Sequence, residues 1–214
     1  MNRAMAGNEV AFREALAKEA MAWSVSCEPA QRDAIARYAS LLLTWTARIN
    51  LTGAVSLENL AAEHLPDSFA LASRLSDAGA LSTIDVGSGG GLPALPLAIL
   101  CPNLSIRLLE PIAKKAAFLR TAVRELELGA RVKVETKRAQ TVAPATFDVA
   151  LSRATLPPRA WLPLAAELVR PGGRVFLLAA ADEAPPPPAS LSSVGQWPYL
   201  DGRRVLVELV KAHS

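Results

Sequence analysis

The first third of the chain carries hydrophobic residues at helical spacing. The residues of one stripe, which recur at intervals of three and four, are Ile35, Tyr38, Leu42, Trp45 and Ile49. A second stripe runs through 57–71, where Ser56 is a suitable N-cap and Asp67 and Ser68 are candidates to cap the helix that follows them. We therefore expect residues 9–76 to be helical, with 48–53 as the connection between the two stripes.

From residue 82 the pattern changes to short β-rich runs separated by helical stretches. The runs lie at 82–86, 104–110, 131–135, 147–151 and 173–180, with helices expected at 92–101, 112–128 and 158–170. Strands that alternate with helices at this spacing form βαβ units and a parallel sheet. The segment Pro171-Gly172-Gly173 is expected to end the third of these helices. A last run, 204–210, is expected to pair antiparallel at or near the sheet edge.

These patterns predict an α/β protein in two parts. Residues 1–80 form a helical N-terminal extension, and residues 81–214 form a domain with a doubly wound, mostly parallel sheet. The 214 residues are 51% hydrophobic and 20% charged, which allows a sizeable core and excludes a largely disordered chain. The longest apolar run, 92–101, is too short to span a bilayer. We expect a soluble cytoplasmic protein without a membrane partner.

The two cysteines and the charged residues add little by themselves. Cys27 and Cys101 lie far apart, and no CxxC or Cys/His cluster is present, so we expect free thiols and no bound metal. The net charge of +3 is compatible with an acidic polymer as partner but does not require one. Four basic residues fall within one expected helix: Lys114, Lys115, Arg120 and Arg124. Charge alone favours a solvated helix face here over a nucleic-acid contact.

The most informative segment is 85–92 (DVGSGGGL), which closes an expected strand and opens a helix. Glycines at 87, 89 and 91 permit positive φ and the close approach of a ligand to the backbone. In a doubly wound sheet this turn lies at the carboxyl edge, where nucleotide-like ligands bind. Glu110 ends the next expected strand, and its carboxylate is able to accept two hydrogen bonds from a ribose diol.

Three interpretations of this segment compete. A dinucleotide site prefers GxGxxG, but Leu92 stands where the third glycine would be. A phosphate-binding P-loop requires a GK[ST] ending, which is missing. Asp85 at the end of one strand, then GxGxG, then Glu110 at the end of the next, fits binding of S-adenosylmethionine best. Dinucleotide binding and a purely structural turn remain open on these residues alone.

Taken together with other segments, this loop resembles the bacterial 16S ribosomal RNA guanine-N7 methyltransferases, also called the glucose-inhibited division protein B family. The matching pieces, in the order of the family, are 42–45 (LLTW), 48–52 (RINLT), 64–68 (HLPDS), 85–93 (DVGSGGGLP), 108–110 (LLE), 114–115 (KK), 138–140 (RAQ), 147–148 (FD) and 152–154 (SRA). They span about residues 38–180. The NLT, His-x-x-Asp-Ser and Ser-Arg-Ala segments are more particular to the family than the glycine loop.

The resemblance implies a cofactor site for S-adenosylmethionine and a role for each matching residue. Gly87, Gly89 and Leu92 would line the site at the loop, and Glu110 would hold the ribose. The adenine would lie beside two further residues, Ala139 and Gln140. Arg153 would lie near the methionine end or the incoming base, and we take it as the candidate catalytic residue. The implied partner is 16S ribosomal RNA, either free or within the small-subunit particle.

The sequence also departs from the family pattern. Glu63 stands where an arginine is usual, and 178–182 (LAAAD) lacks the usual lysine-glycine pair. These changes bear on RNA contacts more than on cofactor binding. His64 is more readily explained as a packed or capping histidine than as a catalytic one. Two alternatives stay open: a methyltransferase for a small molecule on the same fold, and a non-catalytic RNA module that binds S-adenosylmethionine.

The expected chemistry demands few catalytic groups. N7 of guanine carries an in-plane lone pair at neutral pH, so no general base must remove a proton before it attacks the methyl group. Catalysis then consists mostly of aligning N7, methyl and sulfur. This explains why the chain carries no Ser/His/Asp or paired-carboxylate constellation. A broad rim of basic residues around the cofactor mouth would favour RNA, and a closed apolar pocket would favour a small substrate.

Overall fold

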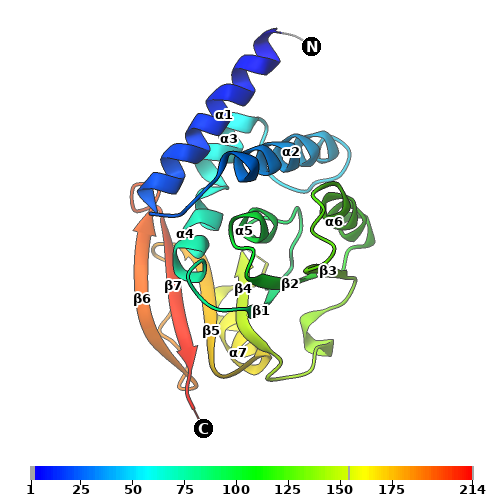
Figure 1. Ribbon diagram of the computed structural model, residues 1–214. Helices are drawn as coiled ribbons and strands as arrows, with labels where there is room; N and C mark the ends of the chain where they lie inside the picture. The colour runs from blue at the N-terminus through cyan, green and yellow to red at the C-terminus, as the bar shows by residue number, and fades with distance from the viewer. Residues whose placement is uncertain (1–2, 154, 214) are drawn as a thin grey trace.

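The protein is a three-layer α/β structure, seen in a computed structural model that describes residues 3–153 and 155–213 (Figure 1). Its helices are α1 (Arg3–Ala22), α2 (Pro29–Thr46), α3 (Leu57–Glu63), α4 (Pro66–Leu75), α5 (Ala94–Leu100), α6 (Ala113–Glu125) and α7 (Pro158–Leu168), with the short 3-10 helix η1 (Ala139–Thr141). Its strands are β1 (Leu81–Val86), β2 (Leu104–Leu109), β3 (Val132–Glu135), β4 (Phe147–Arg153), β5 (Val169–Ala180), β6 (Leu191–Tyr199) and β7 (Arg204–Lys211).

The described residues form one seven-stranded sheet in the order β3-β2-β1-β4-β5-β7-β6. Strands β1 to β5 are parallel, and β7 pairs antiparallel with both β5 and β6. This confirms the doubly wound, mostly parallel sheet expected from the sequence. Strand order reverses between β1 and β4, which opens a crevice at their carboxyl ends. The glycine loop follows β1, and Arg153 ends β4, so both lie at this crevice.

Side chains alternate between two hydrophobic layers, as the pleat of a strand requires. In β5, Phe176 and Leu178 face the core under α1 to α6, whereas Val175 and Leu177 face the core under α7. Figure 1 shows α7 on one side of the sheet and the remaining labelled helices on the other. No helix in the described part of the chain is both long and apolar enough to cross a membrane.

The helical N-terminal extension is anchored on the glycine loop. The buried hydroxyl of Tyr38, in α2, donates to the carbonyl of Gly90 at 2.6 Å. Gln31, also in α2, donates to the carbonyl of Ile99 at 2.8 Å. The hydrophobic core runs without a break from α1 and α2 into α5, α6 and the sheet. The extension therefore shares its core with the remainder of the chain.

Several expected boundaries in the N-terminal half need correction. The stripe at 57–71 is two helices: α3 ends before His64, whose φ is −125°, and Pro66, which lacks the amide needed to continue a helix, begins α4 at its first position. Ser56 does cap α3, since its Oγ accepts from the amide of Asn59 at 3.1 Å. Asp67 and Ser68 do not cap α4: its N-cap is Leu65, and the Ser68 hydroxyl donates to the carbonyl of Pro93 at 3.0 Å.

Two features of the C-terminal half also differ from expectation. Helix α7 ends at Leu168, and Pro171-Gly172-Gly173 lies inside β5, where the pairing with β4 shifts register between Phe147 and Val149. Gly172 has φ of 75° within this irregular stretch, a conformation that glycine adopts readily. Strand β6 is the second difference. The sequence does not predict it, because its polar residues and Pro198 are typical of an edge strand and give little hydrophobic alternation.

Candidate active site at the carboxyl edge of the sheet

The glycine loop is held in a fixed shape at the end of β1. The amides of Gly87 and Ser88 both donate to the carbonyl of Leu109, at 2.9 and 3.0 Å. Gly87, Gly89 and Gly91 have φ of 76°, 53° and 84°, values that residues other than glycine rarely adopt. A Cβ on Gly89 would meet nothing closer than the carbonyl of Gly87 at 3.8 Å. Space for a ligand therefore lies directly above Gly89.

Glu110 ties this loop to the next helix. One carboxylate oxygen accepts from the amide of Gly89 at 2.9 Å, and the other accepts from the amide of Ile112 at 2.8 Å. Glu110 is buried, with 4% of its surface exposed. A carboxylate has about four lone-pair positions, so two remain for further donors. The arrangement fits an acidic residue that both shapes the loop and accepts hydrogen bonds from a ligand.

A cavity of about 1140 Å³ opens beside the loop. Of the predicted site residues, Gly87, Gly89, Leu92 and Arg153 line this cavity. Glu110 is not part of the lining, but its carboxylate accepts a hydrogen bond from the amide of Gly89, which is. Ala139 and Gln140 lie outside the lining, in η1 after β3; Ala139 is buried in the core under α7, and Gln140 is exposed.

Asp85 lies buried under the loop at the end of β1. Its Oδ2 has no hydrogen-bond partner among the described residues. Burial raises the pKa of this carboxyl to about 7, an effect that the Ser88 hydrogen bond and the charge of Arg153 oppose. An orphaned polar oxygen at this depth is rare in folded proteins. It indicates a site completed by a polar ligand group.

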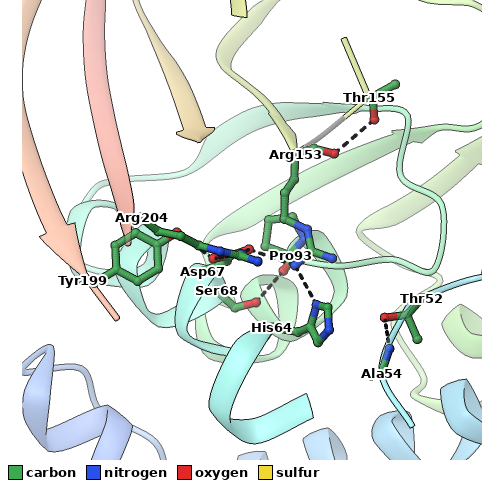
Figure 2. A network of polar contacts seen from close by, with 10 residues as sticks. All are labelled: Thr52, Ala54, His64, Asp67, Ser68, Pro93, Arg153, Thr155, Tyr199 and Arg204. Carbon is green, nitrogen blue, oxygen red and sulfur yellow. Dashed lines mark hydrogen bonds and ion pairs between the residues drawn. The ribbon is translucent and has the colours of Figure 1, made fainter. Parts of the chain in front are cut away.

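Arg153 points from the end of β4 toward α4, as Figure 2 shows. Its Nη1 lies 2.9 Å from Oδ2 of Asp67 and 3.3 Å from Nδ1 of His64. Asp67 also binds Arg204 and Tyr199. The neighbouring Ala154 lies outside the described residues. The sequence indicated Arg153 and the segment with His64 and Asp67, but not their contacts, because Arg153 is 89 and 86 positions away from these two residues in the chain.

His64 ends α3 and lines the cavity half-buried. Burial lowers the pKa of His64 below its usual value, and the nearby charges of Arg153 and Arg204 lower it further. The imidazole is therefore neutral at pH 7. Nδ1 of His64 lies 3.3 Å from Nη1 of Arg153, and a packing role for His64 stays a prediction.

The lining of the cavity is mainly basic. Five basic side chains line it, against two acidic ones, Glu63 and Glu183; the basic set is Lys115, Arg153, Arg159, Arg203 and Arg204. Arg203 forms a bidentate pair with Glu63, with both distances 3.0 Å. Leu178, Ala179 and Ala180 give an apolar wall where the family usually has a lysine. No cluster of three or more His, Cys, Asp or Glu suited to a metal ion occurs in residues 3–153 and 155–213.

Comparison with known proteins identifies the family of this chain. Residues 31–185 match the family described as rRNA small subunit methyltransferase G. The chain belongs to this family. A relative from Anaeromyxobacter dehalogenans named ribosomal RNA small subunit methyltransferase G is 38% identical over 171 residues, 78% of each chain. One of the same name from Burkholderia pseudomallei is 38% identical over 168 residues, 76% of this chain and 72% of its own.

Solved structures support the fold independently. The TYW2 protein of Pyrococcus horikoshii in complex with MeSAdo superposes with a TM-score of 0.52 at 14% identity, over 66% of this chain and 61% of that one. Family membership confirms the resemblance found in the sequence motifs. It also confirms a methyltransferase and S-adenosylmethionine as its cofactor. The roles of single residues remain predictions.

Proposed function

We propose that this protein transfers the methyl group of S-adenosylmethionine to N7 of a guanine in 16S ribosomal RNA of the small subunit. Family membership supports the reaction. The main observation in favour of RNA as the substrate is the cavity at the glycine loop. Its lining contains five basic side chains and two acidic ones. A wide, cationic cavity suits a polyanion, whereas a small substrate is usually enclosed by apolar walls.

The cofactor fits the carboxyl edge of the sheet. Gly87, Gly89 and Leu92 would border the bound cofactor, with Asp85 beneath them as a buried acceptor. Glu110 would accept hydrogen bonds from the ribose hydroxyls with the lone pairs left free by Gly89 and Ile112. Ala139 and Gln140, in η1, would hold the adenine through an apolar and a polar contact. The sulfonium supplies a methyl group already activated for transfer.

The protein's contribution to the reaction is alignment. The bound cofactor would supply a methyl carbon that the N7 lone pair of guanine attacks, with the electron pair of the broken carbon–sulfur bond left on sulfur. The positive charge would pass to the purine, so the residues of this chain would have no proton to transfer. Arg153 donates to O6, an acceptor next to N7, and so holds the base in line. His64, which is neutral at pH 7, packs beside this guanidinium and takes no proton.

The decisive experiment is methyl transfer with labelled S-adenosylmethionine. Its substrates are unmodified 16S RNA and small-subunit particles, with the modified base mapped afterwards. We expect label at N7 of one guanine. Transfer to neither substrate would overturn the proposal, and label only on a small molecule would establish the alternative on the same fold. Binding of the cofactor without any transfer would establish the non-catalytic RNA module.

A further inference from the structure

Asp67 is a fully buried carboxylate with four polar contacts. Its Oδ1 accepts from the hydroxyl of Tyr199 at 2.6 Å and from Nη1 of Arg204 at 2.9 Å. Its Oδ2 accepts from Nη1 of Arg204 at 2.8 Å and from Nη1 of Arg153 at 2.9 Å. Figure 2 shows the two guanidinium groups and the phenol converging on this one side chain from separate elements.

The two arginines bound by Asp67 keep part of their surface for the cavity. The side chain of Asp67 is 0% exposed, whereas those of Arg153 and Arg204 are 18% and 29% exposed. Both arginines line the cavity. One negative charge against two positive charges leaves an excess of about one positive charge at the cavity floor. The carboxylate thus fixes two cations without neutralising both.

A second buried carboxylate provides a contrast within the same protein. Glu208, 3% exposed, lies 2.9 Å from Nε of Arg74 and 2.9 Å from Nε of Arg174. It joins α4 to β7, as Asp67 does. Neither of its arginines belongs to the cavity lining. A buried ion pair is weak evidence of stability by itself, because desolvation offsets much of the attraction. The two clusters therefore differ in location, not in type.

The position of Arg204 relates this cluster to the substrate more than to the cofactor. The sheet order places β5 between β4 and β7, so the backbones of Arg153 and Arg204 lie two strands apart, about 10 Å across the sheet. Their guanidinium groups converge from the two sides on Oδ2 of Asp67, at 2.9 and 2.8 Å. The glycine loop follows β1, on the opposite side of β4. A ligand at the glycine loop that extends past Arg153 reaches Arg204 at its far end.

We propose that Asp67, supported by Tyr199, is a positioning residue that fixes Arg153 and Arg204 at the cavity floor, where they orient the target nucleotide. This inference rests on the proposed transfer to RNA. Arg153 meets the base, and Arg204 meets the adjoining phosphate. Asp67 itself touches no substrate and acts through the two guanidiniums. Tyr199 donates to the carboxylate and keeps its oxygens directed at both of them.

The main test is the Asp67→Asn variant, which keeps the shape of the side chain and removes its charge. We expect turnover on RNA at saturating cofactor to fall by about tenfold or more, because a small misplacement of orienting groups is costly. Affinity for S-adenosylmethionine, measured by calorimetry, is expected to stay within about threefold of wild type, which is less than about 1 kcal/mol. Glu208→Gln is the matched control and is expected to retain wild-type turnover.

A spectroscopic readout separates positioning from general destabilisation. The chain contains two histidines, His64 and His213. The charges acting on His64 come from Glu63, Asp67, Arg153 and Arg204, and Asp67 raises the pKa of His64 against the two arginines. In Asp67→Asn, the NMR titration of His64 is expected to move to lower pH. In Glu208→Gln, the titration of His64 is expected to stay at its wild-type position.

These experiments distinguish failure of the positioning role of Asp67 from failure of the proposed methyl transfer to RNA. If wild type transfers no methyl group to RNA, the proposed function fails. If wild type and Asp67→Asn turn over RNA equally, or if Glu208→Gln loses as much turnover as Asp67→Asn, the positioning role fails. Tyr199→Phe covers the case in which Asp67→Asn does not fold: a severalfold loss of turnover supports the role, and wild-type turnover overturns it.

Discussion

Arg153 leaves the end of β4 with one guanidinium nitrogen bound to Asp67 and the remaining side chain at the cavity. With this geometry Arg153 could either orient the target guanine or hold the cofactor, and a substitution of Arg153 would affect RNA turnover in the first case and cofactor binding in the second. A guanidinium that orients guanine acts only when RNA is bound. One that holds the carboxylate of the cofactor acts in its binding. The pairing with Asp67 already supplies a carboxylate to Arg153 and favours the first function.

We expect Arg153→Ala to keep its affinity for S-adenosylmethionine and to lose most of its turnover on RNA. Arg153→Lys is not expected to restore turnover, because lysine keeps the charge but loses the planar fork of donors. Calorimetry and methyl transfer on the same preparation check both points. A loss of cofactor affinity of roughly 1.5–3 kcal/mol would instead assign Arg153 to the cofactor carboxylate. Wild-type values in both assays would remove Arg153 from the site.

The buried carboxyl group of Asp85 is expected to make the free energy of unfolding depend on pH. Burial raises the pKa of Asp85 to about 7 in the folded protein, against about 3.9 in the unfolded chain. The folded state therefore binds the proton more tightly, and the stability this contributes is present below about pH 4 and lost as pH rises toward 7. We expect Asp85→Asn to raise the free energy of unfolding at pH 8 by roughly 1–4 kcal/mol and to change it little at pH 4. Urea unfolding at the two pH values measures this, and equal effects at both would contradict it.

At the scale of elements, the glycine loop is the part whose shape decides cofactor binding. Gly87 has φ of 76°, and a Cβ there would clash with the Thr155 side chain. We expect Gly87→Val to lower the affinity for S-adenosylmethionine by about tenfold or more, which is about 1.4 kcal/mol. Gly79→Ala is the control, since a Cβ at Gly79 has nothing within 4 Å. Unchanged calorimetric affinity in Gly87→Val would remove the loop from the cofactor site.

Local sequence signals predicted the elements that local forces determine. The Ser56 cap, the alternation of strands with helices and the glycine loop each depend on residues close together in the chain. The break at Pro66 was also readable locally, but the continuous apolar stripe concealed it. Strand β6 was missed because edge strands carry polar residues and little hydrophobic alternation. The Asp67 cluster was missed for a different reason: it joins α4, β4, β6 and β7, and no local pattern encodes contacts between segments so far apart.

At the scale of the whole molecule, helix α6 borders the basic cavity, because Lys115 belongs to the cavity lining. The structure changes the interpretation of the four basic residues of α6. Lys115 lines the cavity and Lys114 is exposed beside it. Arg120 donates to the hydroxyl of Thr136 at 2.6 Å, and Arg124 pairs with Glu125 at 3.1 Å. The two lysines are therefore better candidates for phosphate contacts than the two arginines.

RNA binding by the wild-type protein is accordingly expected to weaken steeply as salt rises. Each neutralised phosphate contributes roughly 0.7–0.9 to the slope of log affinity against log salt concentration, because bound RNA releases counterions. If Lys114 and Lys115 each contact one phosphate, the double variant Lys114→Ala/Lys115→Ala loses about 1.5 from this slope. Lys18→Ala, an exposed lysine of α1 outside the cavity lining, is the control and keeps the wild-type slope. A salt titration by fluorescence anisotropy on a labelled 16S fragment measures all three proteins. A steep slope that the double variant retains would exclude the α6 lysines as contacts, and a flat dependence in every protein would contradict RNA as the substrate and favour a small molecule.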